Sequence, residues 1–137
     1  MRTIKFRGKR VDNGEWVYGN LIKMDSEGSQ SFIFPFYEHA SSRPCGQIIA
    51  LNSIAIIPET IGQFTGLVDK NGVEIYEGDI LMCGDRIVEV KWNMPMGTWD
   101  SVFIKYTEAP LSSNGIMNVE WKLRAEVNGN VHERSEV

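Results

Sequence analysis

Residues 65–81 read TGLVDKNGVEIYEGDIL, and they combine two turn signals with the starts of two apolar strands. Asn71-Gly72 is a strong hairpin signal, because both residue types tolerate the positive φ angles of a tight turn. A second turn signal at residues 76–79 precedes an apolar run that begins at Ile80. Such closely spaced turns predict a small, tightly folded β unit, and they indicate no particular reaction.

The 137-residue chain is long enough for one hydrophobic core, or for two small lobes that share an interface. Its hydrophobic content of 42% and charged content of 23% are those of an ordinary globular protein. No apolar run approaches the roughly 18 residues that span a bilayer, and no apolar segment follows the N-terminal charges, so we expect neither membrane insertion nor secretion. The two distant cysteines, Cys45 and Cys83, favour reduced thiols in the cytoplasm.

The net charge of −4 is unevenly distributed along the chain. Residues 1–10 carry five cations and no acid, so the other 127 residues have a net charge of −9. Six carboxylates lie between Asp69 and Glu89, against two cations. The basic and acidic segments could pair within the molecule, between copies, or with unlike partners.

Alternating apolar and polar residues predict strands along the whole chain, and no segment has the helical periodicity of about 10–12 residues that indicates a helix. The predicted strands are residues 4–9, 16–22, 32–37, 48–51, 53–57, 80–83, 86–92, 99–106 and 116–127. Pro35 confines the third of these strands to a sheet edge or a bulge. The sequence therefore predicts an all-β fold with minor helical turns.

Residues 58–62 (PETIG) hold a single helical turn or a loop, and we place a boundary there. An N-terminal β lobe, made of a hairpin and aromatic strands, is expected at residues 1–62, and a C-terminal lobe at residues 63–137. From about Phe64 the order of turns and strands resembles a small SH3-like barrel. In that arrangement Gly78 and Asp79 turn the chain into the first long strand.

Three motifs stand out, at residues 4–8 (IKFRG), the central residues 65–80, and the late residues 126–130 (EVNGN). Together they resemble the YopX family, which consists of small proteins of bacteriophages and prophages. Asn128 and His132 depart from the family pattern, which has an apolar and an aromatic residue there. The resemblance implies a two-lobed β fold with a barrel-like C-terminal part, and a phage origin inside the bacterial cytoplasm. It implies no reaction, ligand or catalytic residue.

The chain contains no pattern typical of a metal or catalytic site. The candidate zinc ligands are His39, Cys45, Cys83 and His132, and they lack paired-ligand spacing. The carboxylates from Asp69 to Asp85 lack the pattern of a calcium loop, and Asp79 is expected to accept backbone hydrogen bonds within its own turn. Neither a Gly-x-Ser-x-Gly nucleophile motif nor a phosphate loop is present. We expect no enzymatic activity, no cofactor, no metal and no small-molecule substrate.

Nucleic-acid binding is one candidate function. Lys5, Arg7 and Lys9 alternate on one strand face at intervals of ~6.7 Å, which is close to the phosphate spacing of a single strand. Aromatic rings that could stack on bases follow at Trp16, Tyr18, Phe32, Phe34, Phe36 and Tyr37. The alternatives are that these rings form the core and that the cations protect a sheet edge against aggregation. Since the pI is near 5.2, any affinity is expected to be weak and steeply salt-dependent.

A protein interaction module is the function that we rank first, as a phage or prophage accessory or regulatory protein. It would act by self-association or by docking on a phage or host protein. The candidate contact residues are Lys5, Arg7, Lys9, Trp16, Tyr18 and Phe36. Trp92, Met94, Met96 and Trp99 flank one turn and form a second candidate patch. The alternative is that Trp92 and Trp99 simply pack against each other across that turn.

Overall fold

A computed structural model describes residues 2–24, 30–35, 53–84, 86–106 and 125–133. The regular elements of this part of the chain are β-strands and one short 3-10 helix, η1 (Pro58–Thr60). The strands are β1 (Phe6–Lys9), β2 (Trp16–Lys23), β3 (Ser31–Pro35), β4 (Ile54–Ala55), β5 (Gly62–Val68), β6 (Glu74–Tyr76), β7 (Asp79–Cys83), β8 (Arg86–Asn93), β9 (Thr98–Tyr106) and β10 (Ala125–Asn130). The predicted all-β fold with a minor helical turn is confirmed.

The chain divides into two compact units, Met1–Gln63 and Phe64–Val137. The division falls inside β5. The first two residues of β5 pair with β1 in the first unit, and Phe64 pairs with Tyr76 of β6 in the second unit. Each unit therefore has antiparallel strands and a hydrophobic core of its own.

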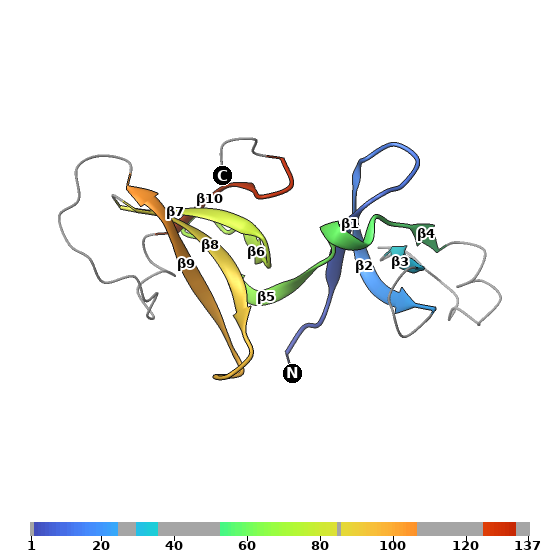
Figure 1. Cartoon of the computed structure of the whole chain (residues 1–137), viewed down its shortest axis with the longest axis horizontal. Coiled ribbons are helices and arrows are strands. Elements are labelled where there is room, and N and C mark those ends of the chain that lie inside the picture. The colour runs from blue at the N-terminus through green and yellow to red at the C-terminus, as the bar shows by residue number, and fades with distance from the viewer. Residues whose placement is uncertain (1, 25–29, 36–52, 85, 107–124, 134–137) are drawn as a thin grey trace. The chain divides into compact units, whose positions relative to one another are not determined.

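The first unit is built on the predicted N-terminal hairpin of β1 and β2 (Figure 1). Gly14 adopts a φ of 72° in the turn, and its N–H donates to the Arg10 carbonyl oxygen at 3.0 Å. The Asn13 side chain accepts a hydrogen bond from the Glu15 N–H at 2.9 Å. β2 continues to β3 and β3 to β4, which makes the strand order β4-β3-β2-β1.

Strand β1 is not at a sheet edge, because β2 pairs with it on one side and β5 on the other. The interpretation that its alternating cations protect an edge is therefore wrong. The reason lies in η1, which brings the chain back to β1: the Lys9 N–H donates to Thr60 Oγ1 at 2.8 Å, and β5 begins two residues later. Sequence alternation alone does not reveal this return.

The core of the first unit comprises Val17, Ile33 and Ile56, with Leu21, Ile54 and Ile61 packed against them. Two glycines allow the close approach of neighbouring chain segments. A Cβ atom on Gly8 would lie 2.7 Å from Ile56 Cδ1, and one on Gly19 would collide with the Phe34 carbonyl oxygen. The prediction that Pro35 confines its strand to a sheet edge or a bulge is wrong, because β3 lies between β2 and β4. Pro35 is tolerated there because it is the last residue of β3, beyond the residues that pair with β4.

The second unit contains the β5–β6 hairpin and a four-stranded antiparallel sheet in the order β10-β7-β8-β9 (Figure 1). Its buried core consists of Ile75, Leu81, Val88, Val90 and Ala125. These strands do not confirm the closed SH3-like barrel that the order of turns suggested. The predicted entry into the first long strand is confirmed, since Gly78 has a φ of 89° and β7 begins at Asp79.

Asp69 explains why the central motif is decisive for this fold. Its Oδ1 accepts the N–H groups of Asn71 at 2.8 Å and Val73 at 2.9 Å, which shapes the hairpin turn. Its Oδ2 accepts the Val127 N–H at 2.9 Å, and the Lys70 N–H donates to the Ala125 carbonyl oxygen at 3.1 Å. One turn of four residues therefore holds the β5–β6 hairpin and strand β10 together.

The second turn of the motif works in the same way. Asp79 is 1% exposed, and its Oδ2 accepts the Tyr76 N–H at 2.7 Å, which confirms the predicted backbone hydrogen bond within this turn. The Gly78 N–H donates to the Val90 carbonyl oxygen at 2.9 Å, and the Gly78 carbonyl oxygen accepts the Val131 N–H at 3.0 Å. Both acidic turns are therefore part of the framework of the fold.

Candidate interaction surface

The predicted contact residues of the first unit fall into two neighbouring strands. Arg7 and Lys9 lie in β1, with Lys5 just before it, and Trp16 and Tyr18 lie in β2. The antiparallel register pairs Arg7 with Tyr18 and Lys9 with Trp16, so all four side chains belong to one face of the hairpin. Phe36 and Tyr37 lie outside the described residues.

Trp16 brings two cations together. The guanidinium carbon of Arg7 lies 4.7 Å from the centroid of the Trp16 ring, and Lys9 Nζ lies 5.5 Å from it. A cation over an indole ring is attracted by the ring quadrupole, and the attraction is stronger where water is excluded. Arg7 is only 5% exposed. These cations are therefore engaged within the molecule.

Lys5, Arg7 and Lys9 alternate as predicted, but Arg7 does not project into solvent, because its side chain is buried beside Trp16. Lys5 and Lys9 are half-buried, and Tyr18 is 44% exposed. The alternative that the nearby rings belong to the core is confirmed for Phe34, which is 9% exposed, while Phe32 is half-buried. This face offers less charge and less open aromatic surface than the sequence indicated.

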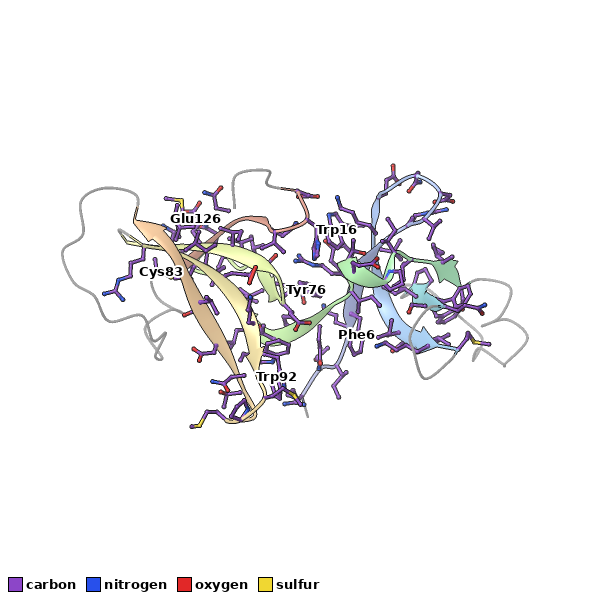
Figure 2. The ribbon with its side chains drawn as sticks, viewed as in Figure 1. Phe6, Trp16, Tyr76, Cys83, Trp92 and Glu126 are labelled. Carbon is purple, nitrogen blue, oxygen red and sulfur yellow. The ribbon has the colours of Figure 1, made fainter. Side chains whose placement is uncertain are left out.

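The hairpin of β8 and β9 carries the second predicted patch. Trp92 and Trp99 are opposite one another in the register, and their ring centroids lie 4.9 Å apart at an interplanar angle of 70°. The expectation that the two rings pack across the turn is confirmed, in the edge-to-face geometry that aromatic pairs favour. Packing does not bury the pair, since Trp92 remains 39% exposed. Figure 2 shows Trp92 near the end of this hairpin.

The turn between these tryptophans presents two methionines to solvent. Met94 is 78% exposed and Met96 is 72% exposed. We call Trp92, Met94, Met96 and Trp99 the hairpin tip. No charged residue lies between Trp92 and Trp99 in the sequence. Large apolar side chains gathered on an uncharged turn are typical of a contact surface.

Hydrogen bonds hold this turn in one conformation. Gly97 has a φ of 62°, and its N–H donates to the Met94 carbonyl oxygen at 3.3 Å. Asn93 Oδ1 accepts the Met96 N–H at 3.2 Å, and Asn93 Nδ2 donates to Asp100 Oδ2 at 3.2 Å. The exposed methionines therefore stand on an ordered turn, which lowers the entropy lost when a partner binds.

The hairpin tip continues the apolar face of the core. Val88, Val90 and Trp92 alternate along β8 and thus share one face of the strand. The two valines are buried in the core of the second unit, and Trp99 packs against that core. Towards the turn the same face becomes exposed, so the tip is an extension of the core that the described part of the chain leaves uncovered.

The comparison with known protein families shows which family the chain belongs to. A family model described as YopX protein matches residues 5–137. The chain belongs to the YopX family. No curated protein matches it.

Within the described part of this YopX chain, no group of three or more histidine, cysteine, aspartate and glutamate side chains is arranged to hold a metal ion. Burial raises the pKa of the Cys83 thiol, and the charge of Arg86 opposes this only in part, so the reactive thiolate is disfavoured. No helix among the described residues is long and apolar enough to cross a membrane.

Sequence reasoning placed a turn at residues 93–97 of this YopX protein but missed the side-chain hydrogen bond that fixes it. Asn93 and Asp100 are seven positions apart and join across the hairpin. An asparagine directly before Met-Pro-Met-Gly is a recognisable turn-initiating signal. Asp100 had only an alternating strand pattern around it, and its role depends on the register of β9 against β8.

Proposed function

We propose that this YopX protein is a non-enzymatic protein interaction module that docks on another protein through the hairpin tip. We propose further that it serves as an accessory or regulatory protein of a phage or prophage in the bacterial cytoplasm. The observation that supports docking is the exposure of Met94 and Met96 on an ordered turn beside a half-exposed tryptophan pair.

The energetics of binding favour a protein contact at the tip. Tryptophan is enriched among the residues that dominate binding energy, and methionine adapts its flexible side chain to irregular partner surfaces. Because the turn is already ordered by Asn93 and Gly97, few side chains must be immobilised besides Met94 and Met96.

The chemistry of the tip also indicates which kind of partner surface it would bind. An uncharged, apolar projection is desolvated at little cost when it enters an apolar groove, whereas a strongly charged groove would lose its hydration without compensation. We therefore expect a partner protein that presents an apolar groove or pocket to the tip.

The test uses a tagged chain in its bacterial host, with wild type compared with the Met94→Ser, Met96→Ser variant. We expect at least one identified protein to co-purify with the wild type and to be depleted about tenfold or more with the variant, equivalent to about 1.4 kcal/mol of binding. The purified pair must then reproduce this difference in a titration. If every co-purifying protein is retained equally by both forms, the tip is not the docking surface.

Weak nucleic-acid binding by the N-terminal hairpin is the second candidate function. It is supported by Lys9 and Tyr18 on one face of the hairpin, where Tyr18 is 44% exposed. Gel shifts with single-stranded DNA and RNA at low salt provide the test, with wild type compared with Lys5→Glu, Lys9→Glu. We expect a shift that disappears as salt rises. Identical migration of the two forms would refute it.

A further inference from the structure

The outer side of an edge strand has unpaired backbone groups that can pair with another chain, and natural proteins protect such edges. Three of the four terminal strands in the described residues carry such protection. β4 has only two residues and β6 only three, so neither offers a useful template. β10 is interrupted by a register shift between Val127 and Asn130, at a glycine with a φ of 93°. A bulge of this kind breaks the regular spacing of backbone groups.

Strand β9 differs from these three edges. It has nine residues, Thr98–Tyr106, and contains neither proline nor glycine. It is the last strand of its sheet, and among the described residues only β8 pairs with it (Figure 1). Its pairing is regular from Thr98 to Phe103, and the register shift comes only after that point. This stretch is long enough to accept another strand.

Asp100 alters the outer edge of β9. Its Oδ1 accepts the N–H of the next residue, Ser101, at 2.8 Å, and its Oδ2 accepts Asn93 Nδ2 at 3.2 Å. A strand laid along β9 needs free N–H donors at every second residue. Val90 is opposite Ser101, and its carbonyl oxygen accepts the Gly78 N–H on the β7 side, so the backbone groups of Ser101 face away from β8. The carboxylate thus occupies an outer-edge donor in the middle of the regular stretch.

We propose that the outer edge of β9 is a strand-pairing surface for a second copy of this chain, and that Asp100 keeps it closed. The edge matches itself, since two antiparallel copies related by a two-fold axis present the same spacing of donors and acceptors. The inference does not depend on docking by the hairpin tip.

The charge of Asp100 explains why this edge disfavours pairing with a second copy of the chain. Asp100 is the only charged residue between Thr98 and Ile104. In an antiparallel pair centred on Ser101, the two Asp100 side chains of the two copies would be diagonal neighbours about 7–8 Å apart on one face. Two carboxylates at that distance repel each other, so Asp100 blocks the pairing both by its hydrogen bond and by its charge.

The experiment measures molecular mass by light scattering from micromolar to millimolar concentration. All variants carry Met94→Ser and Met96→Ser, which removes association through the tip without adding charge. With Asp100→Ala we expect the mass to rise with concentration from 15.5 kDa towards twice that value. The matched control is Glu89→Ala, which removes an equal charge from β8, where Glu89 pairs with Lys91 at 3.1 Å. This control is expected to keep the mass of a single chain.

A further variant tests whether the association uses the outer edge of β9. Adding Ser101→Pro to Asp100→Ala removes the N–H that the second strand would use, and proline is tolerated where an edge N–H faces solvent. We expect this double change to restore the single-chain mass. Hydrogen exchange should show β9 amides whose protection grows with concentration in the Asp100→Ala protein only.

Three results would overturn the proposal: a single-chain mass for Asp100→Ala at every concentration, equal association of Glu89→Ala, or association that persists after Ser101→Pro is added. If Asp100→Ala loses the native circular dichroism spectrum, Asp100→Thr decides the question. Threonine favours strands and lacks both the carboxylate and its charge, so association above that of the Asp100 protein supports the closed edge, and a single-chain mass refutes it.

Discussion

Two four-residue turns of the second unit have similar backbone geometry, but one is bonded to a distant strand and the other exposes its side chains. The turn at Asp69–Gly72 ends in a glycine with a φ of 82°, and the turn at Met94–Gly97 in a glycine with a φ of 62°. The first is tied to β10 by hydrogen bonds to Ala125 and Val127. The second is bonded to its own hairpin, and it exposes both methionines.

The difference lies in the side chains that the turns carry. A carboxylate offers two oxygens to backbone N–H groups, so Asp69 connects segments of the fold and becomes buried. Methionine offers no comparable acceptor, and the side chains of Met94 and Met96 remain exposed within the described part of the chain. The turn with the strong sequence signal therefore serves folding, and the turn with the weaker signal is the better candidate for function.

The largest expected effect is on the charged turn. Asp69→Ala removes one carboxylate that serves three backbone donors and leaves the N–H groups of Asn71, Val73 and Val127 to find other partners. Since hydrogen bonds to charged acceptors contribute about 1.5–3 kcal/mol each and part of the loss is regained through water, we expect the free energy of unfolding to fall by about 3 kcal/mol. Urea denaturation measures it.

The control for Asp69 is Asp12→Asn in the exposed turn of the first hairpin, where Asp12 pairs with Arg10 at 2.7 Å. Because this pair is on the surface, its loss should leave the urea midpoint unchanged within error. Equal midpoints for Asp69→Ala and the wild type would show that the charged turn does not hold β10.

Acid should weaken the same turn. Desolvation raises the pKa of Asp69, but the N–H groups of Val127, Val73 and Asn71, with the charge of Lys70, outweigh it and keep the pKa below its ordinary value. A carboxyl group with a lowered folded-state pKa contributes stability that is complete above its unfolded pKa of about 3.9 and is lost as the pH falls through the folded pKa.

Urea unfolding at a series of pH values below about 5 measures this loss. Asp69→Asn cannot ionise, so its stability should fall less steeply over the same pH range than that of the wild type. Parallel curves for the two proteins would contradict a stabilising carboxylate at position 69.

The two tryptophans of the tip should differ in their contribution to stability. Trp99 packs against the core, so Trp99→Ala should lower the free energy of unfolding by about 2 kcal/mol, below the value for a fully buried ring. Trp92 is 39% exposed, and Trp92→Ala should cost about 1 kcal/mol, largely the lost aromatic pair. Thermal melts of both variants provide the comparison. The reverse order would place Trp92 in the core.

The smallest effect is expected for the exposed methionines. Met94→Ser, Met96→Ser should change the free energy of unfolding by less than about 0.5 kcal/mol, as is usual for surface positions without specific contacts. Urea denaturation checks this. A loss comparable to that of Asp69→Ala would mean that the methionines support the fold, and the contrast between the two turns would disappear.

Local patterns predicted much of this molecule, because alternation with period two and Asn-Gly turns act over a few residues. The N-terminal hairpin, the turn into β7 and the Trp92–Trp99 pair are all of this kind. The expected barrel, by contrast, depends on how separate strands close on one another, which local alternation does not encode.

Contacts between distant segments were beyond sequence reasoning. Thr60 bonds to Lys9 across 51 residues, next to the point where β5 pairs with β1 and makes it a central strand. Asp69 bonds to Val127 across 58 residues. The burial of Arg7 follows from a register that sets its side chain against Trp16, so a cation that reads as exposed in the sequence is enclosed. In each case the deciding partner is remote in the chain.

The most direct test compares the two turns as contact surfaces in living bacteria. A photo-crosslinking amino acid is placed at position 96 or at position 71, both of which are exposed. We predict that position 96 links to an identified protein partner and that position 71 yields no such product. Crosslinks to the same protein from both positions, or from position 71 alone, would contradict the assignment of the hairpin tip as the interaction surface.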